Sequence, residues 1–422
     1  MRVGLLSVLV FCLPVVAGCH GLRVAFYRPP APHYRQLASV PIRGDDLDIG
    51  SLRRAAEASL RYFERVPEHR SYVLGYDRYN SGQLKRSVLS FLDIIETTDP
   101  ALLHARLSRE CRAYSPATQA RFTAYYEPVL EARRNRDERF RYPIYRRPGE
   151  LKVVRLRRFF TGDNRLINGW LSGNELVPYL SRRDIDGGRR LDGRRLELAW
   201  VDDPVALYFL HIQGSGRLKL PGGKTVRINF AASNGMAYTS IGRHMLSSGL
   251  IGAGSAPAIR DYLSAHPESR ENIMFKNQRY IFFREVELDD RQGPLGSLGV
   301  PLVAGRSLAV DTRFVPPGVV AHISSDKPLI DGDGGVVWER FSRFAFSHDS
   351  GAAIKGPGRV DVYWGEGEKA GLAAGYLNRK GSLTLLVCGV EPSPGRIATV
   401  DGNHRTAYVG RRWRGQEQTG RL

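Results

Sequence analysis

The sequence predicts a mainly β protein that begins with a short helical region. Apolar residues recur at helical spacing between Leu52 and Cys111. From Phe122 onward, short aromatic and β-branched runs alternate with Gly, Pro and Asp turns, which indicates strands. Between about Pro301 and Val390 all the apolar runs are of this second kind and closely spaced. That pattern is typical of a small closed barrel or a sandwich.

The composition fits a soluble protein with more than one domain. The 422 residues suffice for two domains, each with a core of its own, and a charged fraction of 25% is ordinary for such a protein. The formal net charge of +19 predicts attraction to polyanions. Nucleic acid would be one such partner, but the export signal described next argues against it. Peptidoglycan, with its stem-peptide carboxylates, and lipid headgroups remain, although genome composition alone could also explain the many arginines.

The N-terminus reads as a secretory signal over residues 1–18. Arg2 precedes a short apolar run, Gly4 to Val16, and the small residues Ala17 and Gly18 follow it. The run is too short to span a bilayer. The alternative is a buried N-terminal strand or helix.

The segment Val16-Ala-Gly-Cys19 resembles a bacterial lipobox, in which cleavage before the cysteine leaves a lipid-modified Cys19. Several acyl chains on one cysteine would hold the protein firmly to a membrane. The residue that follows Cys19 is His20 and not an aspartate, which indicates that the protein is directed to the outer membrane. We therefore expect a periplasmic protein anchored to that membrane, and a plain cleaved signal is the alternative.

Two cysteines, Cys111 and Cys388, lie beyond the signal and the candidate anchor. An oxidising periplasm would permit a disulfide between them. Two buried free thiols are the alternative.

The expected elements follow in chain order. A Pro-rich tether, Tyr27 to Pro32, precedes the helices, and Leu196 to Leu220 reads as strand, turn and strand. A helix is expected over Pro257 to His266, and the basic tail, 396–422, is expected to be loosely ordered. The N-terminal helical faces are Leu52, Ala56, Leu60 and Phe63; then Leu84, Val88, Leu92 and Ile95; and a third helix over Ala101 to Cys111. The expected C-terminal strands are Ser307–Phe314, Gly318–Ile323, Arg359–Gly365 and Leu383–Val390.

Asp361 is the first candidate for catalysis. Strand alternation places Val360, Val362 and Trp364 on one face, and Asp361 with Tyr363 on the other. A carboxyl that is partly buried away from the core would have a raised pKa and could act as an acid near neutral pH. The alternative is a strand-end aspartate that accepts hydrogen bonds from turn amides.

Two further aspartates, Asp349 and Asp311, lie at strand-to-turn boundaries. Each could cap the amides of its turn, take a direct chemical part, or shape the electrostatic field around Asp361. Candidate saccharide contacts come from side chains that can stack on a sugar ring or bond its rim. They are Thr123, Tyr125, Tyr126, Gln213, Ser215 and Lys355, with core packing as the alternative for one of the tyrosines.

Several other site classes are disfavoured. The loop around Lys355 lacks the Gly-Lys-Ser/Thr ending of a phosphate-binding loop, and Gln213 occupies the first glycine position of a nucleophile elbow. The ten histidines show no metal-ligand spacing, so neither a metal nor another cofactor is expected.

Several sequence blocks occur in a fixed order along the chain. They are Phe122-Thr-Ala-Tyr-Tyr-Glu-Pro, Trp200-Val-Asp-Asp-Pro, Ile212-Gln-Gly-Ser-Gly, Tyr280-Ile-Phe-Phe, Pro301-Leu-Val-Ala-Gly-Arg-Ser-Leu-Ala-Val-Asp311, and Asp349 to Trp364. Taken together, these blocks resemble the membrane-bound lytic murein transglycosylase A family with its three-aspartate (3D) domain. The Asp349 block departs from the family's Asp-Thr-Gly-Gly-Ala-Ile-Lys-Gly at two positions: Ser350 keeps the hydroxyl, whereas Ala352 replaces a glycine, so a positive φ there would be strained.

The resemblance implies a double-psi β-barrel with a second β domain inserted after the Phe-Thr-x-Tyr-Tyr segment, and a substrate groove between the two. The barrel domain would comprise 20–129 and 286–395, and the inserted domain 130–285. Residue by residue, the family's sole acid/base falls on Asp361, and the aspartate that opens its glycine-rich block falls on Asp349.

The function implied is that of a peptidoglycan lytic exotransglycosylase, a carbon–oxygen lyase that forms 1,6-anhydromuramic acid. A cell-wall synthesis complex is a further partner that the resemblance suggests. Two alternatives stay open: a hydrolase that pairs Asp361 with Asp349 or Asp311, and a non-catalytic wall-binding lipoprotein.

Overall fold

The computed structural model describes residues 32–393, except 43, 160–165, 288, 290–291 and 331–334. The predicted signal, Cys19, nearly all of the Pro-rich tether and the predicted basic tail lie outside the described residues. Within the part that is described, no helix is both long and apolar enough to cross a bilayer.

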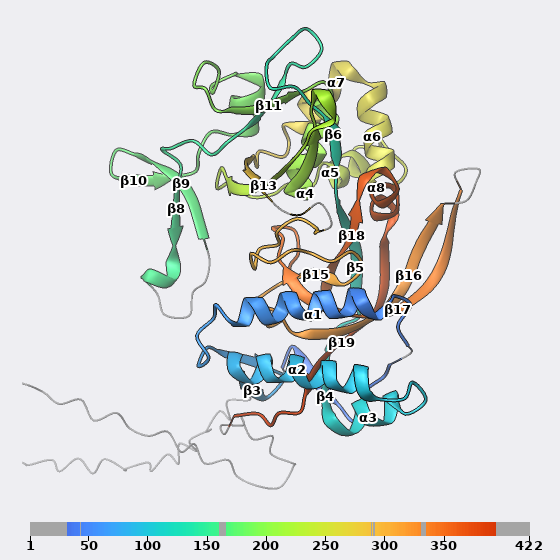
Figure 1. Ribbon diagram of the computed structural model, residues 1–422. Coiled ribbons are helices and arrows are strands. Elements are labelled where there is room, and N and C mark those ends of the chain that lie inside the picture. The colour runs from blue at the N-terminus through green and yellow to red at the C-terminus, as the bar shows by residue number, and fades with distance from the viewer. Residues whose placement is uncertain are drawn as a thin grey trace, which may run out of the picture. The chain divides into compact units, whose positions relative to one another are not determined.

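Six strands close into a barrel, which confirms the mainly β class (Figure 1). Around the barrel the order is β5-β19-β16-β17-β15-β18, and β18 pairs in parallel with β5 to complete the ring. The double-psi connectivity stays a prediction. The barrel strands are β5 (Ala120–Glu127), β15 (Ser307–Val310), β16 (Val320–Ile330), β17 (Val336–Asp349), β18 (Arg359–Glu366) and β19 (Asn378–Cys388).

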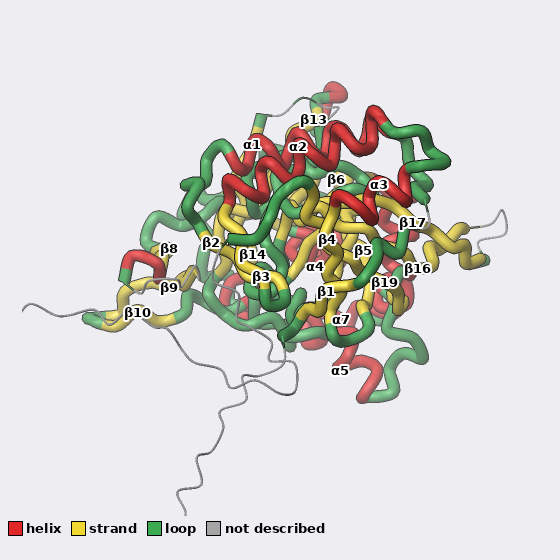
Figure 2. Tube along the Cα trace, turned by 90° about the horizontal axis from the view of Figure 1, so that it is seen from below, coloured by secondary structure: helices red, strands yellow, loops and turns green. Residues whose placement is uncertain are grey.

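Two more strands and three helices surround one side of the barrel. Strands β4 (Cys111–Pro116) and β1 (Tyr34–Leu37) extend the sheet beyond β19, and helices α1 and α2 run side by side and pack on β17 and β19 (Figures 1 and 2). Side-chain caps begin these helices, since Asp48 accepts from the Ser51 amide and Asn80 forms a capping box with Gln83. The helices are α1 (Ile49–Phe63), α2 (Ser81–Thr97) and α3 (Leu103–Glu110), as predicted, and the hairpin β2 (Ser71–Leu74) and β3 (Asp77–Asn80) separates the first two.

A disulfide joins Cys111 to Cys388, which decides between the bridge and the two free thiols. The two cysteines are register partners on the neighbouring strands β4 and β19. Their sequence separation is 277 residues, so the bridge ties the end of the helical region to the last barrel strand.

Residues 129–286, called the insert below, follow β5 along the chain and precede the other five barrel strands. They form smaller sheets and helices of their own. Its four-stranded sheet has the order β14-β13-β12-β6, and its two-stranded ladder pairs β7 with β11. The strands are β6 (Val129–Glu131), β7 (Tyr142–Tyr145), β8 (Lys152–Arg155), β9 (Leu166–Ser172), β10 (Glu175–Val177), β11 (Glu197–Val201), β12 (Ser215–Lys219), β13 (Thr225–Ser233) and β14 (Ile281–Val286).

The prediction of strand, turn and strand over Leu196 to Leu220 is wrong, because a helix, α4 (Pro204–Gln213), lies between β11 and β12. Asp203 caps its first turn, Pro204 occupies a first-turn position, and Gly214 ends it in the left-handed conformation with φ 80°. Most of its side chains are buried and apolar, so the sequence shows no amphipathic period and reads as strand.

Four further helices, α5 to α8, lie in the insert and near the end of the barrel region. The predicted helix over Pro257 to His266 is confirmed as α6 (Ala256–Ala265). Helix α8 (Gly367–Tyr376) interrupts the region that was predicted to be all strand, so that prediction is wrong there. The sequence also gave no signal that we recognised for α5 (Ile241–Ser247) and α7 (Pro267–Met274).

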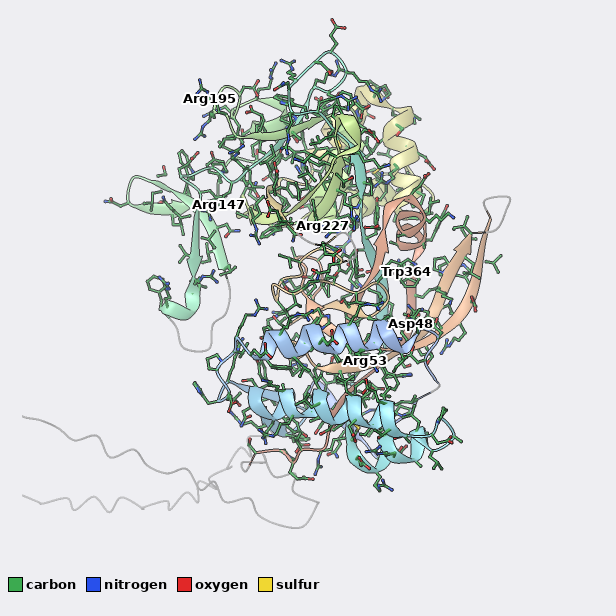
Figure 3. The ribbon with its side chains drawn as sticks, viewed as in Figure 1. Asp48, Arg53, Arg147, Arg195, Arg227 and Trp364 are labelled. Carbon is green, nitrogen blue, oxygen red and sulfur yellow. A yellow bond between two sulfur atoms is a disulfide. The ribbon has the colours of Figure 1, made fainter. Side chains whose placement is uncertain are left out.

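A buried ion network joins the insert to the end of β5. The Glu127 carboxylate, fully buried, accepts from Arg227 Nε at 2.9 Å and from Arg217 Nε at 3.1 Å. Arg217 also pairs with Glu366 at the end of β18. Figure 3 labels Arg227 where the insert meets the barrel. The removal of either partner of a buried pair is costly, so this network fixes the path of the chain as it leaves the barrel.

Candidate active site

Asp361 lies in the middle of β18, between β15 and β5. Its register partners are Ala309 and Thr123. Val360 and Val362 are buried in the barrel core, whereas the Asp361 side chain is half-buried. The predicted alternation is therefore confirmed for these residues, and it directs the carboxylate away from the core.

Thr123 and Arg359 hold the Asp361 carboxylate in place. The Thr123 hydroxyl donates a hydrogen bond to Asp361 Oδ1, and the same hydroxyl accepts from Arg359 Nη2 at 2.7 Å. The threonine is thus polarised by the guanidinium while it donates to the carboxylate, an arrangement in which each hydrogen bond strengthens the other. Thr123, predicted as a saccharide contact, is placed against the candidate acid.

Asp349 lies close by, at the end of β17, and both of its oxygens are engaged. Oδ2 accepts from the Tyr125 hydroxyl at 2.9 Å, and Oδ1 accepts from the amides of Ser297 and Ser350, each at 2.8 Å. Tyr125 also packs against Tyr363, with ring centroids 5.5 Å apart. The structure therefore brings Asp361, Asp349, Thr123 and Tyr125 into one group.

Burial and charge both act on the two carboxyls. Burial raises the pKa of Asp361; the charge of Arg359 and the Thr123 hydrogen bond oppose this, and the charge of Asp349 adds to it. Burial likewise raises the pKa of Asp349, although its hydrogen bonds lower it. A raised pKa lets Asp361 hold a proton at a pH where an exposed aspartate would be ionised.

Asp311 belongs to a different group. Its carboxylate accepts from the Arg313 guanidinium at 2.6 and 2.9 Å and from the Gly356 amide at 2.9 Å. Burial acts to raise the pKa of Asp311, but these hydrogen bonds outweigh it and the pKa is lowered. Asp311 therefore remains ionised and anchors the loop that carries Lys355.

Lys355 is exposed on that loop, beside Gly356. Ala352, three residues earlier, stands where the related family has glycine. Among the described residues, the non-glycine positions with a left-handed backbone are Arg189 and Arg195, so Ala352 does not adopt that conformation. The alanine thus introduces no strain of this kind into the loop.

Gln213 and Tyr126 meet at the contact between the insert and β5. Gln213 Oε1 accepts from the Tyr126 amide at 3.0 Å, and the Tyr126 hydroxyl accepts from Arg260 Nη2 at 2.8 Å. Ser215, two residues further on, is only 6% exposed, so little of it can meet a ligand without a local movement. Tyr126 follows Tyr125 along β5, and Gln213 is the last residue of helix α4, so this contact joins the insert to the strand that carries Thr123 and Tyr125.

Two contributors were missed from the sequence. Arg359 shares a strand face with Asp361, two residues away, so the alternation that selected Asp361 could also have found it. Ser297 lies in the long loop before β15, and no local pattern predicts that its amide binds Asp349. Among the described residues, no three His, Cys, Asp or Glu side chains are grouped so as to hold a metal ion.

Comparison with known proteins identifies two family models in the chain. The MltA-specific insert domain matches residues 121–284, and the 3D domain matches residues 306–387. The membrane-bound lytic murein transglycosylase A of Vibrio cholerae is 30% identical over 278 residues, which cover 65% of this chain and 66% of the relative. The match thus spans just under two thirds of that relative's length.

Solved structures give wider coverage. The membrane-bound lytic murein transglycosylase from Agrobacterium tumefaciens is 30% identical, with a TM-score of 0.65, covering 82% of this chain and 97% of that one. Escherichia coli MltA with bound chitohexaose, 23% identical, shares the fold with a TM-score of 0.65, covering 85% of this chain and 96% of that one. The chain therefore belongs to the membrane-bound lytic murein transglycosylase A family.

Proposed function

We propose that the protein is a lytic transglycosylase that cleaves the β-1,4 bond between N-acetylmuramic acid and N-acetylglucosamine in peptidoglycan. The observation that carries the proposal is the half-buried Asp361, whose pKa is raised by burial and whose carboxylate is fixed by Thr123. Relatives named as lytic murein transglycosylases, and a structural neighbour that binds chitohexaose, support this substrate class.

In the proposed reaction, Asp361 serves twice. As an acid it protonates the glycosidic oxygen, the C1–O bond breaks, and an oxocarbenium-like centre develops at C1 of the muramoyl residue. As a base it then takes the proton of the muramoyl 6-hydroxyl, whose oxygen bonds to C1 and closes the 1,6-anhydro ring. The carboxyl ends the cycle protonated, as it began, and no water is consumed.

The hydrolase alternative requires a second carboxylate that delivers water. Asp349 is the nearest candidate, but both its oxygens already accept hydrogen bonds, two from backbone amides and one from Tyr125. Its negative charge has another effect, because it raises the pKa of Asp361. We therefore assign Asp349 a supporting electrostatic role.

We infer that the glycan lies between the barrel and the insert. Tyr126 and Gln213 meet there through a hydrogen bond, and the Asp361 group lies on the neighbouring residues of β5 and β18. Gln213, Tyr125, Tyr126 and the exposed Lys355 are the proposed sugar contacts, with Ser215 and Thr123 behind them. Digestion of purified sacculi tests the function: each new muramoyl terminus should be one water lighter than the hydrolytic product.

Replacement of Thr123 by valine should move the pH profile. The Thr123 hydroxyl donates to the ionised form of Asp361 and so lowers the pKa of that carboxyl. Without it the pKa rises, the acid form persists to higher pH, and the descending limb of kcat/KM should shift to higher pH. Thr123→Ser retains the hydroxyl and should keep the wild-type limb. A limb that stays in place in Thr123→Val, or moves to lower pH, would refute the proposed contact.

We propose that the mature chain is held to the outer membrane through a lipid on Cys19, as its lipobox-like sequence predicts. The relatives are named membrane-bound, which is consistent with such an anchor. Radiolabelled palmitate should enter the wild type but not Cys19→Ala, and the variant should fractionate with the soluble periplasm. A wild type that is already soluble after export would leave only a plain cleaved signal.

A further inference from the structure

A cavity of about 600 Å³ lies where two sheets of the insert meet. A backbone bridge joins the β7–β11 ladder to the four-stranded sheet between Arg146 and Phe283 of β14, and the two sheets also share one buried core. The Arg146 amide also donates to the Leu196 carbonyl, which extends the β7–β11 ladder by one hydrogen bond. The cavity is lined by Arg146, Arg147, Leu198, Ala231, Phe283, Arg284 and Glu285. Arg147 is labelled in Figure 3.

Three arginines line this cavity without a salt bridge to any carboxylate in the part of the chain that the structure describes. Glu285, the acidic residue of the lining, is already paired with Arg134, at 2.5 and 3.1 Å. No described carboxylate lies within ion-pair distance of Arg146, Arg147 or Arg284, and all three side chains are exposed. The pKa of Glu285 is lowered mainly by its hydrogen bond to Arg134, and the charge of Arg146 contributes to the same shift. The cavity wall therefore carries an excess of positive charge.

The remaining lining is apolar. Leu198 and Phe283 are buried in the core of the insert, and Ala231 is half-buried beside them. A guanidinium presents a planar fork of donors that matches a carboxylate in a bidentate manner, and a dry floor beneath it strengthens the attraction. The volume lies in the range of small-ligand sites. The cavity thus has the features of a carboxylate-binding site.

A short series of contacts connects this cavity with the Asp361 group. Arg284 is the register partner of Asn229 on β13, and Asn229 is almost fully buried. The Asn229 side chain donates to the Leu295 carbonyl at 2.7 Å and accepts from the Leu295 amide at 3.2 Å. Two residues further along that loop, the Ser297 amide binds Asp349.

We propose that Arg146, Arg147 and Arg284 bind the carboxylates of the peptidoglycan stem peptide. The inference rests on the proposed function: the peptide is attached to the muramoyl residue, the sugar on which Asp361 would act. A glycan held at the barrel would carry a flexible, multiply anionic chain past the insert. The cavity would make the enzyme prefer peptide-bearing over peptide-free glycan, a preference that the catalytic group alone does not explain.

The test compares the double variant Arg147→Gln/Arg284→Gln with wild type on two substrates, peptide-bearing glycan and the same glycan after amidase removal of the peptides. The variant should lose about tenfold in kcat/KM on the peptide-bearing glycan, the effect of a lost charge-assisted contact of about 1.4 kcal/mol. It should stay within about twofold of wild type on the peptide-free glycan. Arg243→Gln, an exposed arginine of α5, is the matched control and should change neither.

An equal loss on both substrates, or no loss on either, would overturn the proposal. Binding is measured separately, by calorimetry of a disaccharide peptide on Asp361→Asn with and without the double substitution. The peptide with its carboxylates amidated should bind the parent as weakly as the native peptide binds the double variant. If Asp361→Asn binds the native and the amidated peptides equally, the site is absent, whether or not the enzyme is a transglycosylase.

Discussion

Replacement of Asp361 by asparagine is expected to lower glycan cleavage by at least about a thousandfold while the fold and glycan binding persist. General acid–base groups contribute 10² to 10⁴ in rate, and here one group would supply both steps. The amide is close in size to the carboxyl and can still accept from the Thr123 hydroxyl. It cannot donate a proton to the glycosidic oxygen or remove one from the 6-hydroxyl. The measurement is the initial rate of soluble product release from sacculi.

The matched control is Asp349→Asn. It removes a negative charge that raises the pKa of Asp361, so the descending limb of the pH profile should move to lower pH while substantial activity remains. Activity of Asp361→Asn within about tenfold of wild type would falsify its role as the acid/base. A loss in Asp349→Asn as large as that in Asp361→Asn would favour a two-carboxylate hydrolase instead.

The second large effect concerns stability. The Cys111–Cys388 bridge closes a loop of 277 residues, and the loop-closure entropy that it removes from the unfolded chain is worth roughly 5.6 kcal/mol. Replacement of both cysteines by alanine should therefore lower the free energy of unfolding by roughly 3–5 kcal/mol, measured by denaturant titration. Reduction of the wild type should produce a comparable loss, and reductant should leave the double variant unchanged.

Catalysis by the folded molecules should survive this change. Cys388 ends β19, whereas the residue of that strand opposite Thr123 is Asn378, about 30 Å away along an extended strand. The specific activity at a temperature where the variant is folded should match that of the wild type. A stable double variant would show that the helices and β4 hold the barrel without the bridge.

The sequence predicts the barrel region and the Asp361 strand because their signals are local. Val360 and Val362 alternate with Asp361 along one strand, so the apolar residues alone indicate which face of the strand is buried. Helix α4 could not be found in this way, since its apolar residues surround the whole helix and leave no period to detect. Its signals are the Asp203 cap and Gly214, which are easily read as turns.

The contacts around the two aspartates lie beyond what local pattern can show. Thr123 and Asp361 are 238 residues apart in sequence, and Tyr125 and Asp349 are 224 residues apart. Only the parallel pairing of β5 with β18 brings Thr123 to Asp361. The arginine cavity is equally non-local, because it arises where two sheets meet at the bridge between Arg146 and Phe283.

The central claim is that the nucleophile lies within the substrate, and digestion in water enriched in heavy oxygen tests it most directly. A transglycosylase closes the muramoyl 6-oxygen onto C1, so the new termini should be 1,6-anhydromuramoyl residues without label. A hydrolase adds one solvent oxygen at each cut. We predict unlabelled anhydro termini throughout the digest, and stoichiometric incorporation of heavy oxygen at C1 would contradict the account.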